Sequence, residues 1–192
     1  MRQWWKIGGV LGGLLLSAPV SAQQLFLLPE SKLWIEGNST LHAWKATATE
    51  LTVTGHAAED AGALRWNIVE AVVRIPVRGL KSGTEGLDEN MYEDLRAEKY
   101  PTITFRLKEC VPAGGAGQGG IPVHIIGWLT VAGKERLLTI PAQWSVQDKR
   151  IRITGSTTLR MTDFGIKPRT FMVVMKVHDE VRVHFDLFLG MR

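Results

Sequence analysis

Hydrophobic and polar residues alternate along most of the chain with the period of two that is typical of β-strands. The C-terminal segment 181–189 is the clearest case. Its odd-numbered positions are Val181, Val183, Phe185, Leu187 and Leu189, and its even-numbered positions are Arg182, His184, Asp186 and Phe188. Since successive side chains of a strand point to opposite faces, this segment predicts a strand with one apolar face and one largely polar face.

The same alternation recurs in earlier segments. Apolar sets on one face are Val69, Ala71, Val73, Ile75 and Val77; Ile103, Phe105 and Leu107; Ile121, Val123, Ile125, Gly127, Leu129 and Val131; Leu138, Ile140, Ala142 and Trp144; and Ile151, Ile153, Gly155, Thr157, Leu159 and Met161. Residues 171–177 are apolar on both faces. A change of phase after Ala48 predicts a β-bulge near Thr49. Together these segments predict eight or nine strands, several of them long.

One segment departs from this period. In residues 86–101, Leu87, Met91 and Leu95 are spaced four apart, which predicts a short helix with one apolar stripe. Asp88 is a candidate cap for its start, and Pro101 ends the helical segment. The glycine-rich run 111–120 predicts a hairpin loop.

Long antiparallel strands with one apolar face each predict an all-β fold, either a sandwich or a sheet closed into a barrel. Few crossover connections favour the barrel, here a lipocalin-like eight-stranded antiparallel barrel with one short helix. The interior of such a barrel is either filled by side chains or holds one small ligand. The alternation alone does not separate these two cases.

The first 22 residues have the layout of a secretory signal peptide. Arg2 and Lys6 precede an apolar run that is too short to span a bilayer, and Val20, Ser21 and Ala22 supply small residues for cleavage. We therefore expect an exported, periplasmic or secreted protein, with one domain at residues 23–192 and a signal peptide at residues 1–22. An uncleaved anchor is the alternative.

The charge and the cysteine content argue against several kinds of partner and against an internal disulfide. The chain has 23 basic and 19 acidic residues, a net charge of +4, and without Arg2 and Lys6 the excess is two. Such a weak, unclustered charge argues against nucleic acid as a partner and against a polybasic membrane patch. Cys110 is the single cysteine, so a hydrophobic core rather than an internal disulfide must hold the fold.

The sequence contains only weak indications of a catalytic or metal-binding site. Ser156 lies within a β-alternating run rather than on the tight strand-to-helix turn that a serine nucleophile needs. The five histidines lack metal-ligand spacing, so no metal or other cofactor is expected. Cys110 has no neighbouring histidine in the sequence and is interpreted as a half-buried, inert thiol.

Three stretches together resemble the YceI-like family of exported lipid-binding proteins. They are GNSTLHAW at residues 37–44, LRAEKYPTITF at residues 95–105, and the region from GWLTVAGKERLLTIP at residues 127–141 to the strand ending at Leu189. Their order and spacing cover nearly the whole chain after residue 22. The resemblance implies a lipocalin-like barrel with an elongated apolar cavity for isoprenoid or fatty-amide-like chains, and it supplies no catalytic residues.

The inward faces supply the candidate ligand-binding residues: Phe105, Leu107, Leu129, Leu159, Met161, Phe171, Met175, Phe185 and Leu187, joined by His42 and Trp44 from the most distinctive motif. Methionine side chains adapt to flexible apolar chains, as a lipid sleeve requires. The alternative for each residue is plain core packing, and for His42 and Trp44 a role in strand pairing. Arg160 and Arg169 flank the turn at Asp163–Ile166 and are either exposed cations or contacts for a polar head group.

The predicted function is non-catalytic binding, storage or transport of a long apolar lipid such as a polyisoprenoid, a quinone tail or a fatty amide. One alternative is an envelope interaction domain with a packed barrel. Another is a redox or lipid-pathway accessory that acts at the barrel mouth through His42 or Cys110. Transient membrane contact and a dimer are both compatible with the sequence.

Overall fold

The computed structural model describes residues 22–171 and 175–192, and its regular elements are mostly strands. The strands are β1 (Gln23–Leu27), β2 (Lys32–Ser39), β3 (Ala43–Ala48), β4 (Thr52–Glu59), β5 (Trp66–Pro76), β6 (Leu80–Lys81), β7 (Thr102–Pro112), β8 (Ile121–Val131), β9 (Lys134–Gln147), β10 (Arg150–Arg160), β11 (Thr170–Phe171) and β12 (Met175–Met191). The helices are η1 (Val77–Gly79), α1 (Glu85–Asp94) and η2 (Met161–Phe164). None of the helices in these ranges has the length and hydrophobicity needed to cross a bilayer.

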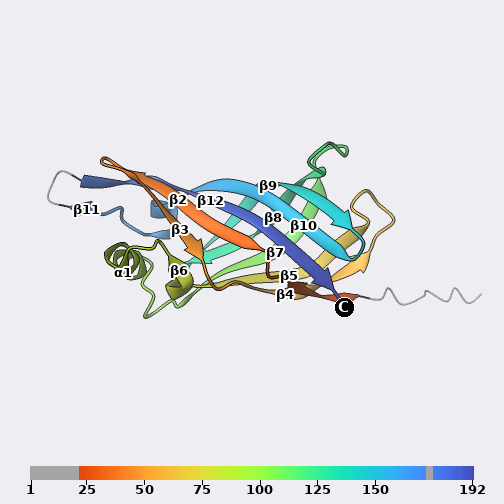
Figure 1. The fold of residues 1–192 in the computed structure, drawn as a ribbon, viewed down its shortest axis with the longest axis horizontal. Helices are drawn as coiled ribbons and strands as arrows, with labels where there is room; N and C mark the ends of the chain where they lie inside the picture. The colour runs from red at the N-terminus through yellow and green to blue at the C-terminus, as the bar shows by residue number, and fades with distance from the viewer. Residues whose placement is uncertain (1–21, 172–174) are drawn as a thin grey trace, which may run out of the picture.

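The strands form a closed antiparallel barrel. Eight of them follow one another around the wall in the order β1, β4, β5, β7, β8, β9, β10 and β12, and pairing of β1 with β12 closes the ring. β2, β3 and β6 extend the wall beyond β1, β4 and β5, since β2 also pairs with β12 and β3 joins β2 to β6. Figure 1 shows the resulting elongated barrel, with α1 at one end and the C-terminus at the other. The predicted eight-stranded antiparallel barrel with one short helix is confirmed.

Two irregularities in the wall differ from the sequence-based expectation. At Thr49 the chain leaves the sheet between β3 and β4, so a break in the strand replaces the predicted bulge there. A bulge occurs instead where β4 shifts register against β5, between His56 and Ala57. The extra residue in β5 reverses the alternation, and Val69, predicted to face inward, is 62% exposed.

The end of the barrel near the C-terminus is filled by the main hydrophobic core. This core includes Leu25, Leu64, Trp66, Trp144, Ile151, Leu189 and Met191. Trp144 is 1% exposed, and its indole Nε1 donates a hydrogen bond to the carbonyl oxygen of Leu64, 3.2 Å away. A buried indole N–H needs such a partner, so this bond helps to hold the loop between β4 and β5 over this end.

Helix α1 lies at the opposite end. Tyr92 is 3% exposed, and its hydroxyl lies 2.8 Å from the carbonyl oxygen of Leu80 and 3.1 Å from that of Arg78. These contacts fix the helix to η1 and β6. The predicted cap at Asp88 is wrong: Thr84 is the N-cap residue, and the buried Asp88 carboxylate accepts hydrogen bonds from the backbone N–H and hydroxyl of Ser82.

Candidate functional site

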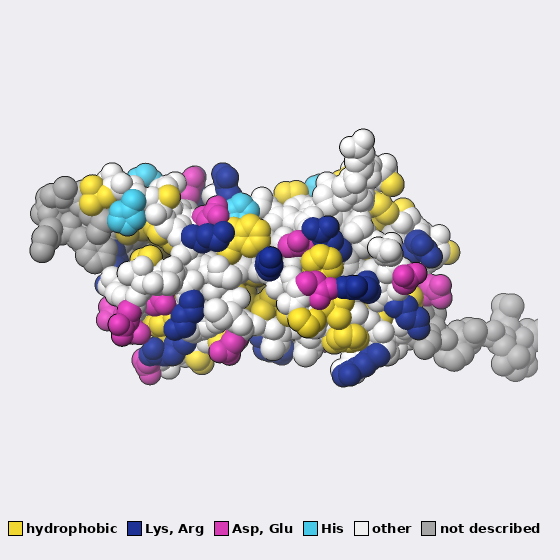
Figure 2. All heavy atoms as spheres, viewed as in Figure 1, with side chains coloured by type: hydrophobic (Ala, Val, Ile, Leu, Met, Phe, Trp, Pro, Cys, Tyr) yellow, Lys and Arg dark blue, Asp and Glu magenta, His cyan; other side chains and the backbone are white. Residues whose placement is uncertain are grey.

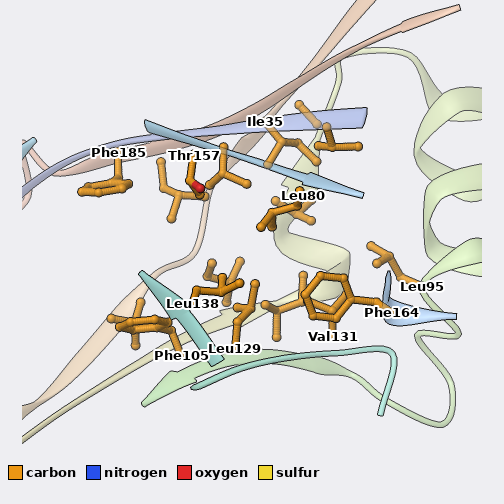
Figure 3. A pocket seen from close by; sticks show the side chains of 18 of the residues that line it. Ile35, Leu80, Leu95, Phe105, Leu129, Val131, Leu138, Thr157, Phe164 and Phe185 are labelled. Carbon is orange, nitrogen blue, oxygen red and sulfur yellow. The ribbon is translucent and has the colours of Figure 1, made fainter. Parts of the chain in front are cut away.

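A cavity of about 530 Å³ lies inside the barrel between the filled end and α1. Its volume falls within the range of roughly 300–1,000 Å³ that is typical of small-molecule sites. Most of its lining is aliphatic or aromatic, as shown by Leu33, Ile35, Val73, Ile75, Phe105, Leu129, Leu138, Leu159, Val181, Val183 and Phe185. In Figure 3 side chains from opposite walls, including Phe185 and Phe105, point toward one another across the open space.

The burial of inward-facing residues changes along the barrel. At the filled end, inward side chains such as Ile151 and Val123 are almost fully buried, at 0% and 1% exposed. Farther along, the inward-facing Phe105, Leu129 and Leu159 are only partly buried, because they border the cavity. The interior is therefore not filled by side chains along its whole length, unlike the packed-barrel alternative.

Glycines in the wall help to keep this interior open. Gly37 pairs with Trp44, and a Cβ atom at Gly37 would lie 2.3 Å from the indole ring. Gly155 pairs with Phe185, and a Cβ atom there would lie 2.6 Å from the phenyl ring. Phe105 lies against Gly127 in the same manner, at 2.4 Å. Each ring occupies the space that a Cβ atom of the glycine would need, so it lies close to the wall and takes up less of the barrel centre.

The structure places nine of the eleven predicted ligand-binding residues on the cavity wall. These are Phe105, Leu107, Leu129, Leu159, Met161, Phe185, Leu187, His42 and Trp44. The side chains of Phe171 and Met175 lie outside the described part of the chain. Whether any of these residues contacts a ligand stays a prediction.

Several wall residues were absent from the predicted set, and Cys110 is the most instructive. Alternation from Phe105 and Leu107 places Cys110 on the outer face. A register shift between Leu107 and Glu109 inserts an extra residue into β7, and Cys110 lines the cavity as a result. Burial raises the pKa of its thiol to about 11, so the thiol is protonated and a weak nucleophile at neutral pH.

Apart from Thr157, the polar lining residues gather at the α1 end of the cavity. They are Ser39 and His42 at the turn between β2 and β3, Thr84, Asn90 and Asp94 on or beside α1, Arg160 at the end of β10, and Arg169 just before β11. His42, Thr84 and Arg160 are solvent-exposed. The cavity therefore reaches the surface at this end, which we call the mouth.

Arg169 connects the two sides of the mouth. Its Nε donates to Asp94 Oδ1 at 2.7 Å, one terminal nitrogen donates to Asn90 Oδ1 at 2.8 Å, and the other donates to Glu93 Oε2 at 2.7 Å. Hydrogen bonding to Glu93 raises the pKa of Arg169 further, so the guanidinium is always charged. Burial raises the pKa of Asp94, although Arg169 partly offsets the shift. The sequence predicts Arg169 to be an exposed cation or a head-group contact, whereas in the structure its guanidinium is held by α1.

In the described part of the chain the histidines do not assemble a metal site. His184 lies on the outer face of β12, where its ring stacks on Trp34 with centroids 5.0 Å apart. No group of three histidine, cysteine or carboxylate side chains among residues 22–171 and 175–192 is arranged to hold a metal ion.

Comparison with solved structures shows the same fold in several proteins. Burkholderia cenocepacia BcnA is 20% identical with a TM-score of 0.67, and the match covers 83% of this chain and 96% of BcnA. A polyisoprenoid binding domain from Saccharophagus degradans, implicated in plant cell wall breakdown, is 14% identical with a TM-score of 0.63, covering 88% and 98%. A Campylobacter jejuni YceI protein is 14% identical with a TM-score of 0.58, covering 100% and 99%.

Sequence comparison places the chain in a family. No curated protein matches the chain at a significant level. The family model described as the YceI-like domain matches residues 35–189, which run from β2 to the last residues of β12 and carry most of the cavity wall. The chain therefore belongs to the YceI-like domain family.

Proposed function

We propose that this protein binds a long apolar lipid inside the barrel and carries or stores it without changing it chemically. The observation that carries this proposal is the cavity of about 530 Å³, with a mostly apolar wall and a polar mouth at the α1 end. A solved structure of the same fold is described as a polyisoprenoid binding domain, which supports an isoprenoid or similar chain as the ligand.

The apolar wall supplies enough free energy for such a ligand. Each buried methylene gains about 0.8 kcal/mol, so a dozen buried carbons contribute roughly 10 kcal/mol before the cost of ordering the chain. The filled end at Trp144 and the mouth at α1 favour one orientation, with the tail toward Trp144 and the head group at the mouth.

The raised thiol pKa of Cys110 supports a binding role over the redox alternative, because a protonated thiol is a poor nucleophile. We propose no catalytic role for Cys110 or His42. Their place in the proposal is as part of the cavity wall and of its mouth.

We also propose that residues 1–22 are removed on export and that the protein works in the periplasm or outside the cell. Residues 1–21 lie outside the described part of the chain. Strand β1 begins at Gln23, the first residue after the predicted cleavage site. Mass measurement of the exported protein tests this proposal: a mature chain starting at Gln23 is expected, and an intact N-terminus would contradict it. We further propose that the mouth contacts a membrane transiently while lipid enters the cavity.

A pair of variants on β12 tests the binding proposal. Phe185 lines the cavity, and Phe188 lies on the outer face, where the Arg152 guanidinium lies 5.0 Å from its ring. Phe185→Asp places a charge in the apolar wall and is expected to abolish uptake of a long-chain polyprenol, measured by extraction and mass spectrometry. Phe188→Asp introduces the same charge outside and is expected to bind normally. A folded Phe185→Asp variant with unchanged uptake would contradict the proposed site.

A further inference from the structure

The cation Arg169 at the mouth is already paired with carboxylates of the protein. Asp94, Arg160 and Arg169 are the lining residues with full charges. Arg169 pairs with both Asp94 and Glu93, at 2.7 Å each. Arg160 is exposed at the end of β10. Burial acts to raise the pKa of the nearby Asp179 carboxyl, but hydrogen bonds from Thr162 and the charge of Arg160 lower it overall.

The Arg169 cluster therefore offers no spare positive charge at the mouth. The Arg169 guanidinium is faced by two carboxylates, Asp94 and Glu93, so this cluster of three side chains carries a net charge of −1. An anionic head group beside this cluster meets carboxylates that already occupy Arg169, and it gains no unpaired cation there. Like charges placed together in this manner disfavour binding.

The mouth nevertheless keeps hydrogen-bond donors. A guanidinium has five N–H groups, and Arg169 uses one from each of its three nitrogens to reach α1. Asn90 accepts from Arg169 through Oδ1, which leaves its amide NH₂ as a donor beside the cavity. These donors suit an uncharged oxygen such as that of a hydroxyl, carbonyl or amide group.

We propose that the mouth selects lipids whose head group is uncharged and accepts hydrogen bonds, and that the Asp94, Glu93 and Arg169 cluster discriminates against phosphate, pyrophosphate and carboxylate heads. This inference rests on the proposed lipid-binding function and adds the chemical class of the ligand's head. Arg169 acts here as a positioning residue for the two carboxylates and not as an anion receptor.

Two ligands with one tail test the proposal. Geranylgeraniol and geranylgeranyl pyrophosphate share the same chain, and binding of either is measurable by tryptophan fluorescence because Trp44 and Trp144 line the cavity. We expect the alcohol to bind at least about tenfold more tightly at low salt. Because salt screens surface charges, the difference is expected to shrink as ionic strength rises.

Matched variants on α1 test whether Glu93 and Asp94 cause the difference in binding between the alcohol and the pyrophosphate. Glu93→Gln removes a charge paired with Arg169, and Asp94→Asn removes one on the cavity wall. Each is expected to strengthen binding of the pyrophosphate severalfold while the alcohol is little affected. Glu89→Gln makes the same change on the same helix, where Glu89 faces Arg78 instead, and is expected to leave the difference unchanged.

The outcomes separate the two proposals. If neither ligand binds to the wild-type protein, both the proposed function and the head-group selection are wrong. If the pyrophosphate binds as tightly as the alcohol, or if Glu93→Gln leaves their difference unchanged, the selection is overturned while the lipid-binding function stands. Thermal unfolding of each variant checks that the fold is kept, and the exposed position of Glu93 makes that variant the decisive one.

Discussion

Gly37 and Trp44 face each other on neighbouring strands near the mouth, and their contact shows how single residues keep the barrel open. The three atoms nearest to a Cβ at Gly37 all belong to the indole of Trp44, at 2.3 to 3.0 Å. The ring therefore lies where a side chain at position 37 would otherwise stand. Gly155 and Phe185 repeat this arrangement deeper in the barrel.

Replacement of Gly37 by alanine tests this role. The added methyl group is expected to push the Trp44 indole into the cavity, because the ring is the part of the contact that can move. We expect weaker lipid uptake and a loss of stability of about 1–3 kcal/mol, the usual cost of overpacking. Equilibrium unfolding and polyprenol extraction measure the two effects.

Gly115→Ala is the matched control for this prediction. A Cβ at Gly115 would meet nothing within 4 Å, so this variant is expected to bind lipid as the wild-type protein does. Equal binding by the Gly37→Ala and Gly115→Ala proteins would show that the indole position does not limit the cavity.

For single residues, the sequence predicts which face of a strand a side chain lies on better than it predicts the residues that the side chain contacts. Period-two alternation correctly places Phe105, Leu129 and Phe185 on the inward face, because side-chain direction in a strand depends on local geometry alone. Whether those faces fill the interior depends on cross-strand partners such as Gly155, which alternation does not identify. The contact of Arg169 with Asp94 joins residues 75 positions apart, and no local pattern indicates it.

Helix α1 is the element that brings polar groups to the mouth. Its apolar stripe of Leu87, Met91 and Leu95 lines the cavity, as a helix covering a barrel end requires. The same helix carries Asn90 and Asp94, which face Arg169. The four-residue spacing predicted this stripe from sequence, whereas the anchor through Tyr92 depends on carbonyl groups of η1 and β6 that only the fold brings near.

Loss of the Tyr92 hydroxyl is expected to loosen this helix. Tyr92→Phe removes the hydrogen bonding to the carbonyls of Leu80 and Arg78 and leaves one buried acceptor without its partner. We expect a loss of about 1 kcal/mol in the free energy of unfolding, together with faster exchange of bound lipid. Urea unfolding and the rate of lipid transfer to vesicles are the measurements.

Tyr100→Phe provides the comparison for this prediction. Tyr100 follows α1 in the chain, and its ring lies against Gly133 at the β8–β9 hairpin, away from the carbonyls that hold Tyr92. A smaller effect is expected there. If both variants exchanged lipid at the wild-type rate, attachment of α1 would not control access to the cavity.

The β-bulges, like the anchor of α1 through Tyr92, depend on partners that are distant in the sequence. The bulge in β7 turns Cys110 into the cavity, and the one in β5 turns Val69 outward. A bulge places two residues of one strand opposite one residue of its partner, so the pattern within one strand does not reveal it. The type of each element was therefore predictable from the sequence. Which side chains point inward beyond a bulge was not.

The whole molecule combines a filled end with an open one. Packing of Trp144, Trp66 and Ile151 supplies the hydrophobic core that a chain without an internal disulfide needs. Beyond this core the barrel continues as far as α1 (Figure 1), and its wall surrounds the cavity (Figure 3). On the face drawn in Figure 2, basic and acidic side chains are interspersed, which agrees with the weak net charge of +4.

The most direct test of the account is the mass of the protein as it is isolated, measured by native mass spectrometry before and after organic extraction. We predict one apolar molecule for each chain, released by the extraction and taken up again when a long-chain polyprenol is added. A bare chain mass in every preparation, with no uptake of added polyprenol, would contradict the proposal that the barrel holds a lipid.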